Sequence, residues 1–309
     1  TRMLNRFHVW FPGGIVIGSL LAYFMMDNLD INWQIYAALL FIPLAIYGVI
    51  FLGQKIPETE RVASGVSYRE MMMAVGAPFT IIISMTLMIL LATKVINFPE
   101  GWMYLALIGL VSLISILEAK LVHKEKAIFP IMFSLMLLTS STELVTNQWV
   151  NALLGGAVES AILLLALIST IMALGRFFAG QLVHRINPVG VLLMSSIFAA
   201  LGIYVLSFVS SSGMTVVGAV LFAIGITYFW PTMLGFCSEY IPRTGALGLS
   251  LLGGAGFVSA SMFMPVMGKI LEENNTSVAL QSMGILPILM IIGFSVLFVV
   301  YRKKKPEVL

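Results

Sequence analysis

The side chains best suited to chemistry in this chain lie between residues 139 and 149, inside an apolar run from residue 128 to residue 154. That run is long enough to cross a lipid bilayer as a helix. Its polar members recur at helical spacing, which places them on one face of the helix. They are Thr139, Thr142, Glu143, Thr146 and Asn147. Because a carboxylate in hydrocarbon is costly, this face must be turned toward protein or water.

Glu143 is the leading candidate for binding a solute or a coupling ion. Burial favours the neutral form of a carboxyl group, which would let Glu143 exchange a proton near neutral pH. The neighbouring hydroxyls and the Asn147 amide could hydrogen-bond a polyol, and Trp149 could stack on a sugar face. Two alternatives stay open. Glu143 could be a structural residue, either satisfied by its neighbours or wet near the outer surface, and Trp149 could be an interfacial anchor.

Two arginines, Arg176 and Arg185, follow at the inner end of the next apolar run. They could form a cytoplasmic gate, because a cationic side chain can cap the C-terminal end of a neighbouring helix and tie two helices together. The alternative is the ordinary excess of positive charge on the cytoplasmic side of a membrane.

Later apolar runs hold the remaining candidates. Tyr228 and Trp230 could line a solute cavity where Pro231 opens the backbone, or they could be packing residues. The glycine-rich run 245–268 predicts close helix packing or a bend that moves during transport. Its candidate positions are Gly253, Gly254, Gly256 and Pro265.

The composition excludes several classes of protein. Of the 309 residues, 60% are hydrophobic and only 10% are charged, whereas soluble proteins carry about 25% charged residues. The single cysteine, Cys237, excludes an internal disulfide, and the scattered histidines give no metal-ligand spacing. Phosphate-binding and dinucleotide-binding motifs are absent from the sequence. We therefore expect no metal, no other cofactor and no nucleic-acid partner.

The apolar runs predict an all-α integral membrane protein with ten transmembrane helices. Their expected ranges are 9–26, 33–52, 71–93, 102–117, 127–154, 159–182, 188–209, 214–236, 245–268 and 282–301. With the N-terminus inside, all but Lys94 and Lys269 of the 17 Lys and Arg residues fall on the inner side. The positive-inside rule then places both ends of this chain in the cytoplasm, with the helices in the cell (inner) membrane.

Two stretches resemble the major facilitator superfamily. Residues 175–188, Gly-Arg-Phe-Phe-Ala-Gly-Gln-Leu-Val-His-Arg-Ile-Asn-Pro, are similar to its loop between helices eight and nine, and are closest to the fucose permease branch of sugar–proton symporters. The run 230–232, the glycines of 253–256 and residues 265–268 resemble helices ten and eleven of that branch. The resemblance implies a helical bundle that transports a sugar by alternating access, with proton coupling and a monomeric state.

The resemblance also divides the chain. Residues 1–54 look like the last two helices of an N-terminal half, 55–126 like a cytoplasmic loop plus two extra linker helices, and 127–309 like a complete C-terminal half of six helices. This arrangement implies an N-terminally truncated fourteen-helix member that could not transport by itself. The branch's acidic coupling residues lie in helices one and four, which have no counterpart here, and His8, Trp10 and Pro12 replace its polar pattern in helix five.

The sequence therefore predicts secondary active transport of a small polar solute, a sugar by resemblance, through a lipid bilayer. Transport of a non-sugar organic solute, or a non-transporting sensor or scaffold, is the alternative. A membrane enzyme would need paired carboxylates, an activated nucleophile or a metal set inside the spans. The spans contain one central carboxylate, so we do not expect an enzyme.

Overall fold

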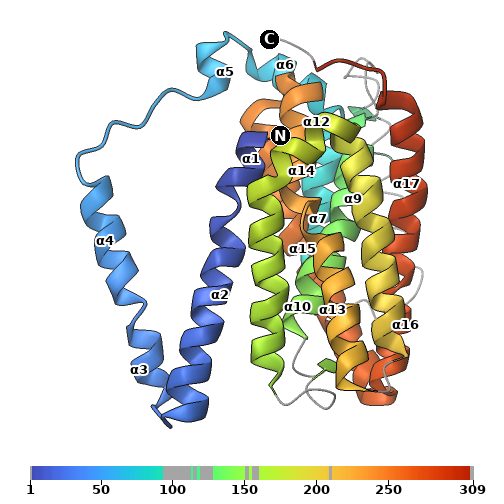
Figure 1. The fold of residues 1–309 in the computed structure, drawn as a ribbon. Coiled ribbons are helices and arrows are strands. Elements are labelled where there is room, and N and C mark those ends of the chain that lie inside the picture. Colours follow the sequence, from blue (N-terminus) through green and yellow to red (C-terminus); the bar gives the residue numbers. More distant parts are fainter. Residues whose placement is uncertain are drawn as a thin grey trace.

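The computed structural model describes residues 2–92, 113, 117–118, 128–149, 153–154, 160–208 and 211–306. Within these ranges the regular elements are all helices, and most of them run along one bundle axis (Figure 1). The predicted span 102–117 lies almost entirely outside the described residues. The start of the chain and the end of the last helix lie at the same end of the bundle, the upper end in Figure 1.

The N-terminal part begins against the bundle and continues into a helical arm that stands apart from it. Its elements are α1 (Arg2–Phe7), α2 (Trp10–Ala22), η1 (Tyr23–Asn28), α3 (Trp33–Ala38) and α4 (Phe41–Phe51). The helix α1 packs against the bundle and buries Asn5 completely. In contrast, α3 and α4 hold no buried residue, and α4 stands apart from the bundle (Figure 1).

The third predicted span is broken rather than continuous. Residues 71–93 were expected to form one helix, but α6 (Tyr68–Val75) ends at Gly76 and α7 (Pro78–Ala92) starts after a bend of 64°. The break has a local cause, because Gly76 adopts φ +82° and Pro78 cannot continue a preceding helix. A short helix, α5 (Glu60–Ala63), precedes this pair. The helix α7 lies against the bundle, where Met85 touches Gly254.

The C-terminal part forms the bundle. It contains α9 (Ile128–Ser140), η2 (Ser141–Val145), α10 (Thr146–Gln148), α12 (Ala161–Ser207), α13 (Ser212–Ile226), α14 (Phe229–Tyr240), η3 (Pro242–Thr244), α15 (Gly245–Glu273), α16 (Thr276–Met283) and α17 (Ile285–Tyr301). Its core is apolar and includes fully buried Phe129, Phe222 and Phe294. The helices α12 and α13 cross so closely that a Cβ added to Gly202 would lie 2.3 Å from the backbone of Phe222. Small residues allow this contact, as expected for helices packed within a membrane.

The element α12 comprises two spans joined at Asn187, which has the non-helical angles φ 57° and ψ 167°. The Asn187 side chain accepts a 2.9 Å hydrogen bond from the backbone N–H of Gly190, and Pro188 occupies the first helical position. This geometry confirms the helix start predicted at Asn-Pro. The two spans run in opposite directions along the bundle (Figure 1).

The described residues contain eight helices that are long and apolar enough to span a membrane, or nine if the bent pair counts as one span. The predicted all-α membrane fold is confirmed, and the count is consistent with the ten helices expected once the range 102–117 is set aside.

Candidate functional site

The polar stretch around Glu143 forms a turn of π-helix, η2. Hydroxyls in and beside this turn hydrogen-bond to their own helix. The Ser141 hydroxyl donates to the Leu137 carbonyl at 2.8 Å, and the Thr142 hydroxyl donates to the Leu138 carbonyl at 2.9 Å. Such back-bonding competes with regular helix geometry and bends helices. Single π turns are frequent at functional sites, and here the turn carries the buried carboxylate.

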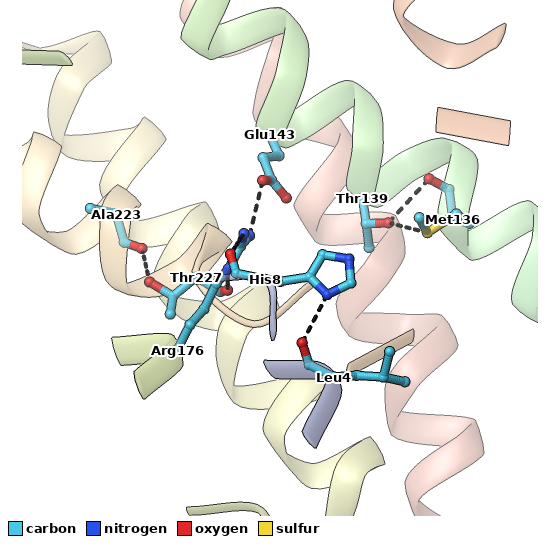
Figure 2. A network of polar contacts seen from close by, with 8 residues as sticks. All are labelled: Leu4, His8, Met136, Thr139, Glu143, Arg176, Ala223 and Thr227. Carbon is cyan, nitrogen blue, oxygen red and sulfur yellow. Dashed lines mark hydrogen bonds and ion pairs between the residues drawn. The ribbon is translucent and has the colours of Figure 1, made fainter. Parts of the chain in front are cut away.

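Glu143 forms a buried ion pair with Arg176. The Arg176 Nη2 atom donates to Glu143 Oε1 at 3.2 Å, and the exposed fractions of the two side chains are only 1% and 2% (Figure 2). The second carboxylate oxygen, Oε2, is buried and has no hydrogen-bond partner among the described residues. Removing one member of such a pair leaves an uncompensated charge, which typically destabilises a protein by about 3–5 kcal/mol.

Arg176 also holds two backbone carbonyls. Its Nε atom donates to the Thr227 carbonyl at 2.7 Å, and its Nη1 atom donates to the His8 carbonyl at 3.2 Å. Thr227 is the residue at which α13 ends, just before α14 begins at Phe229. Arg176 therefore caps the C-terminal end of a helix that is interrupted inside a membrane-spanning segment. Interrupted helices of this kind line binding sites in many transporters.

A cavity of about 250 Å³ lies beside this network. It is lined by His8, Phe11, Glu143, Leu144, Arg176, Trp230 and Phe257. Three of these residues, Glu143, Arg176 and Trp230, were predicted site residues, and the structure brings them together. The sequence prediction missed His8, whose ring Nδ1 lies 2.8 Å from the Leu4 carbonyl (Figure 2). Its position directly beside the predicted span 9–26 was the available signal, because polar residues in spans are usually functional.

The other polar candidates lie outside this cavity. The Thr139 hydroxyl donates to the Met136 carbonyl at 3.1 Å, and Thr142 is likewise satisfied by its own helix. Thr146 is buried, and its hydroxyl has no partner among the described residues. Asn147 lines a second cavity. Trp149 lies against Gly268 of α15, where its ring would be 3.4 Å from an added Cβ.

The predicted gate residues are separated in the structure. Arg176 is buried in the network, whereas Arg185 is exposed. Tyr228 lies at the junction of α13 and α14, with its hydroxyl 3.2 Å from the position of a Cβ added to Gly175. Of the two arginines, Arg176 makes a helix-capping contact, because it donates a hydrogen bond to the Thr227 carbonyl at the end of α13.

The glycines of α15 differ in their surroundings. A Cβ on Gly256 would lie 2.3 Å from the Trp230 ring, and one on Gly254 would lie 2.7 Å from Met85. Gly253 has open space around it. Pro265 lies inside α15, which continues as a single helix to Glu273. Gly256 therefore fixes how closely the Trp230 ring approaches α15.

A bundle of apolar helices around a buried ion pair defines a multi-pass integral membrane protein with a polar centre. The profile of the Major Facilitator Superfamily matches residues 133–309, which is more than half of the chain and includes Glu143 and Arg176. The chain belongs to this superfamily, whose members transport small-molecule solutes across lipid bilayers. No match is found among curated proteins.

Proposed function

We propose that this protein carries a small, hydroxyl-rich solute, a sugar, by alternating access with proton coupling at Glu143. The observation that carries the proposal is the Glu143 carboxylate. One oxygen is held by Arg176, and the other is buried at the cavity without a partner among the described residues. A free carboxylate oxygen in a buried site can accept a hydrogen bond from a solute hydroxyl or take up a proton.

The cavity favours hydroxyl donors over anions. Arg176 already donates to Thr227, His8 and Glu143, so its guanidinium is occupied by protein groups. In neutral His8, the contact of Nδ1 with a carbonyl places the proton on Nδ1, which leaves Nε2 as an acceptor. The volume of about 250 Å³ is at the small end of ligand sites, which usually measure about 300–1,000 Å³. The hydrogen-bond acceptors and the small volume both fit a monosaccharide. Trp230 supplies an aromatic face.

The same geometry supports a coupling step. Protonation of Glu143 would remove the negative partner of Arg176 and leave a guanidinium held only by the carbonyls of Thr227 and His8. These carbonyls belong to the α13–α14 junction and to the N-terminal helices, so Arg176 joins both of them to Glu143 of η2. Loss of the pair would free η2 to move relative to the parts that Arg176 still holds.

The direct test measures uptake of labelled hexoses and pentoses by cells expressing the complete gene, at two external pH values. We expect uptake of one sugar that is faster at the lower external pH. Glu143→Gln should abolish accumulation while preserving sugar exchange across the membrane, because the amide still binds but cannot carry the proton. The control is Glu272→Gln, at the exposed end of α15, which should behave as wild type.

Accumulation that survives in Glu143→Gln would refute coupling at this residue. No uptake of any sugar, with the protein present in the membrane, would refute the sugar assignment. A non-sugar organic solute would then be the next candidate, followed by a sensor or scaffold role.

Several finer features belong to the same proposal: membership of the fucose permease branch, a monomeric state and a gating role for Arg176 and Arg185. We further propose that the helices lie in the inner membrane with both ends of this chain in the cytoplasm. The distribution of Lys and Arg supports this orientation. The start of α1 and the end of α17 lie at one end of the bundle, which is consistent with this orientation (Figure 1).

A further inference from the structure

A second cavity, of about 400 Å³, lies next to the first. Residues of α2, α3, α10 and α12 line it, together with Leu144 of η2. Its polar lining consists of Ser19, Tyr36, Asn147 and Gln148, and none of the described side chains that line it is charged. The Asn147 Oδ1 atom is buried and has no hydrogen-bond partner among the described residues. The cavity therefore offers amide and hydroxyl groups without a charge.

The two cavities meet at two apolar side chains. Phe11 and Leu144 belong to the lining of both. Leu144 directly follows Glu143 in the π turn, and Asn147 lies about one helical turn further along. Phe11 and Leu144, here called the partition, are shared by the cavity that holds Glu143 and Arg176 and by the cavity that holds Asn147 and Gln148.

The partition has a physical consequence for the ion pair. An apolar constriction excludes water, and this property closes many pores. The attraction between Glu143 and Arg176 depends on a dry surrounding, because water would weaken it severalfold. Phe11 and Leu144 thus lie at the boundary between the uncharged second cavity and the first cavity, which holds the ion pair.

We propose that the second cavity is an access subsite for the solute, and that Phe11 and Leu144 form the gate between it and the Glu143 cavity. The subsite takes a neutral, hydroxyl-bearing solute, since its lining can exchange hydrogen bonds with hydroxyls but cannot balance a charge. We place its access at the end of the bundle where α2 meets α3, because Ala22 at the end of α2 and Tyr36 of α3 both line it. The choice of solute rests on the proposed function, whereas the gate rests on the cavities alone.

The gate is tested by cysteine labelling, which needs no solute. Cys237 is the only cysteine of the sequence and is buried, so the unmodified chain should not react with a water-soluble, membrane-impermeant methanethiosulfonate. The protein is examined in membrane vesicles of both orientations, with Asp30→Cys marking the α3 end. We expect Asn147→Cys to react from the same side as Asp30→Cys.

The inner cavity is monitored with His8→Cys and, in case that variant misfolds, with Trp230→Cys. Either cysteine should react slowly from the α3 side. Adding Phe11→Ala should raise the rate about tenfold or more, because removal of about 1.4 kcal/mol from a barrier changes a rate tenfold. Adding Trp10→Ala instead should leave the rate unchanged, since Trp10 is 79% exposed and is not among the residues lining either cavity.

Two labelling results would overturn the gate. The first is labelling of Asn147→Cys only from the side opposite Asp30→Cys. The second is an inner-cavity labelling rate that Phe11→Ala does not raise.

The solute subsite is tested with whichever labelled sugar is taken up. Asn147→Leu should raise KM about two- to tenfold with an unchanged maximal rate, the range expected for one lost hydrogen bond. Gln34→Leu, on the exposed surface of α3, is the control. An unchanged KM in Asn147→Leu would refute the subsite. If no sugar is taken up, the sugar assignment fails, while the labelling experiment still decides the gate.

Discussion

The Nε atom of Arg176 donates a 2.7 Å hydrogen bond to the carbonyl of Thr227, where α13 ends within the membrane-spanning segment. The same guanidinium binds the Glu143 carboxylate. One side chain thus joins a helix end to the buried acid 33 positions away in the sequence.

Arg176→Lys should destabilise the protein and abolish uptake, because an ammonium cannot place donors on Thr227, His8 and Glu143 in the planar arrangement of a guanidinium. The expected loss in the free energy of unfolding is about 1–3 kcal/mol, because the charge is kept but buried carbonyls lose their donors. Thermal unfolding in detergent and uptake in cells measure the two effects. Arg302→Lys, on an exposed residue just after α17, should change neither.

Combining Glu143→Gln with Arg176→Gln should cost less stability than the sum of the two single substitutions. Each single change leaves one buried charge without its partner, whereas the double change leaves none. A double-mutant cycle on the unfolding free energies measures this coupling. Additive losses would show that the two side chains stabilise the fold independently.

Gly256→Ala should lower the melting temperature and alter tryptophan fluorescence, because the new Cβ would lie 2.3 Å from two ring atoms of Trp230. Overpacking of this kind costs about 1–3 kcal/mol. Gly253→Ala is the matched control on the same helix, since nothing lies within 4 Å of its Cβ position. It should be neutral or stabilising by up to about 1 kcal/mol. Equal effects of the two substitutions would contradict the close contact.

Ser259→Ala should weaken the attachment of the π turn to α15. The Ser259 hydroxyl donates to the Leu137 carbonyl at 2.7 Å and contacts Ser141, so it bridges two helices. The expected loss is about 1 kcal/mol. Ser261→Ala removes a hydroxyl that bonds only within its own helix, to Phe257, and should fall within about 0.5 kcal/mol of wild type. The comparison uses thermal unfolding of both variants.

Glu118→Ala should loosen the start of α7. The buried Glu118 carboxylate accepts hydrogen bonds from the backbone N–H groups of Phe79 and Thr80, at 2.9 Å each, and from the Thr80 hydroxyl. Loss of such a cap costs about 0.5–2 kcal/mol. Hydrogen exchange should speed up at Phe79 and Thr80, with a smaller effect for Glu118→Gln, which keeps an acceptor. Unchanged exchange in Glu118→Ala would show that other groups hold this helix end.

Hydropathy was sufficient to predict the helices, because length and apolar composition decide which segments can cross a bilayer. It could not predict the break after Val75, because average hydropathy over a window does not register the local backbone effects of Gly76 and Pro78. Glu143 could be identified because an acid in hydrocarbon is unusual. Its partner could not be identified. Arg176 was interpreted from its place at the inner end of an apolar run, and spacing in the sequence does not reveal which helices face each other.

His8 illustrates the same limit. Its position near the start of an apolar run suggested a solvated edge, whereas the fold brings α1 and α2 onto the bundle and turns His8 toward the cavity. Patterns within one helix reveal which residues share a face. They do not reveal which other helix or cavity lies against that face.

The junction at Asn187 limits the freedom of the bundle to move. Asn187, in a left-handed conformation and accepting a hydrogen bond from Gly190, joins two spans without an intervening flexible loop. A flexible loop would allow the two spans to slide or rotate independently of each other. A displacement of Arg176 on the first span would therefore reach the second span through this one junction, although the second span touches neither member of the ion pair through any described hydrogen bond.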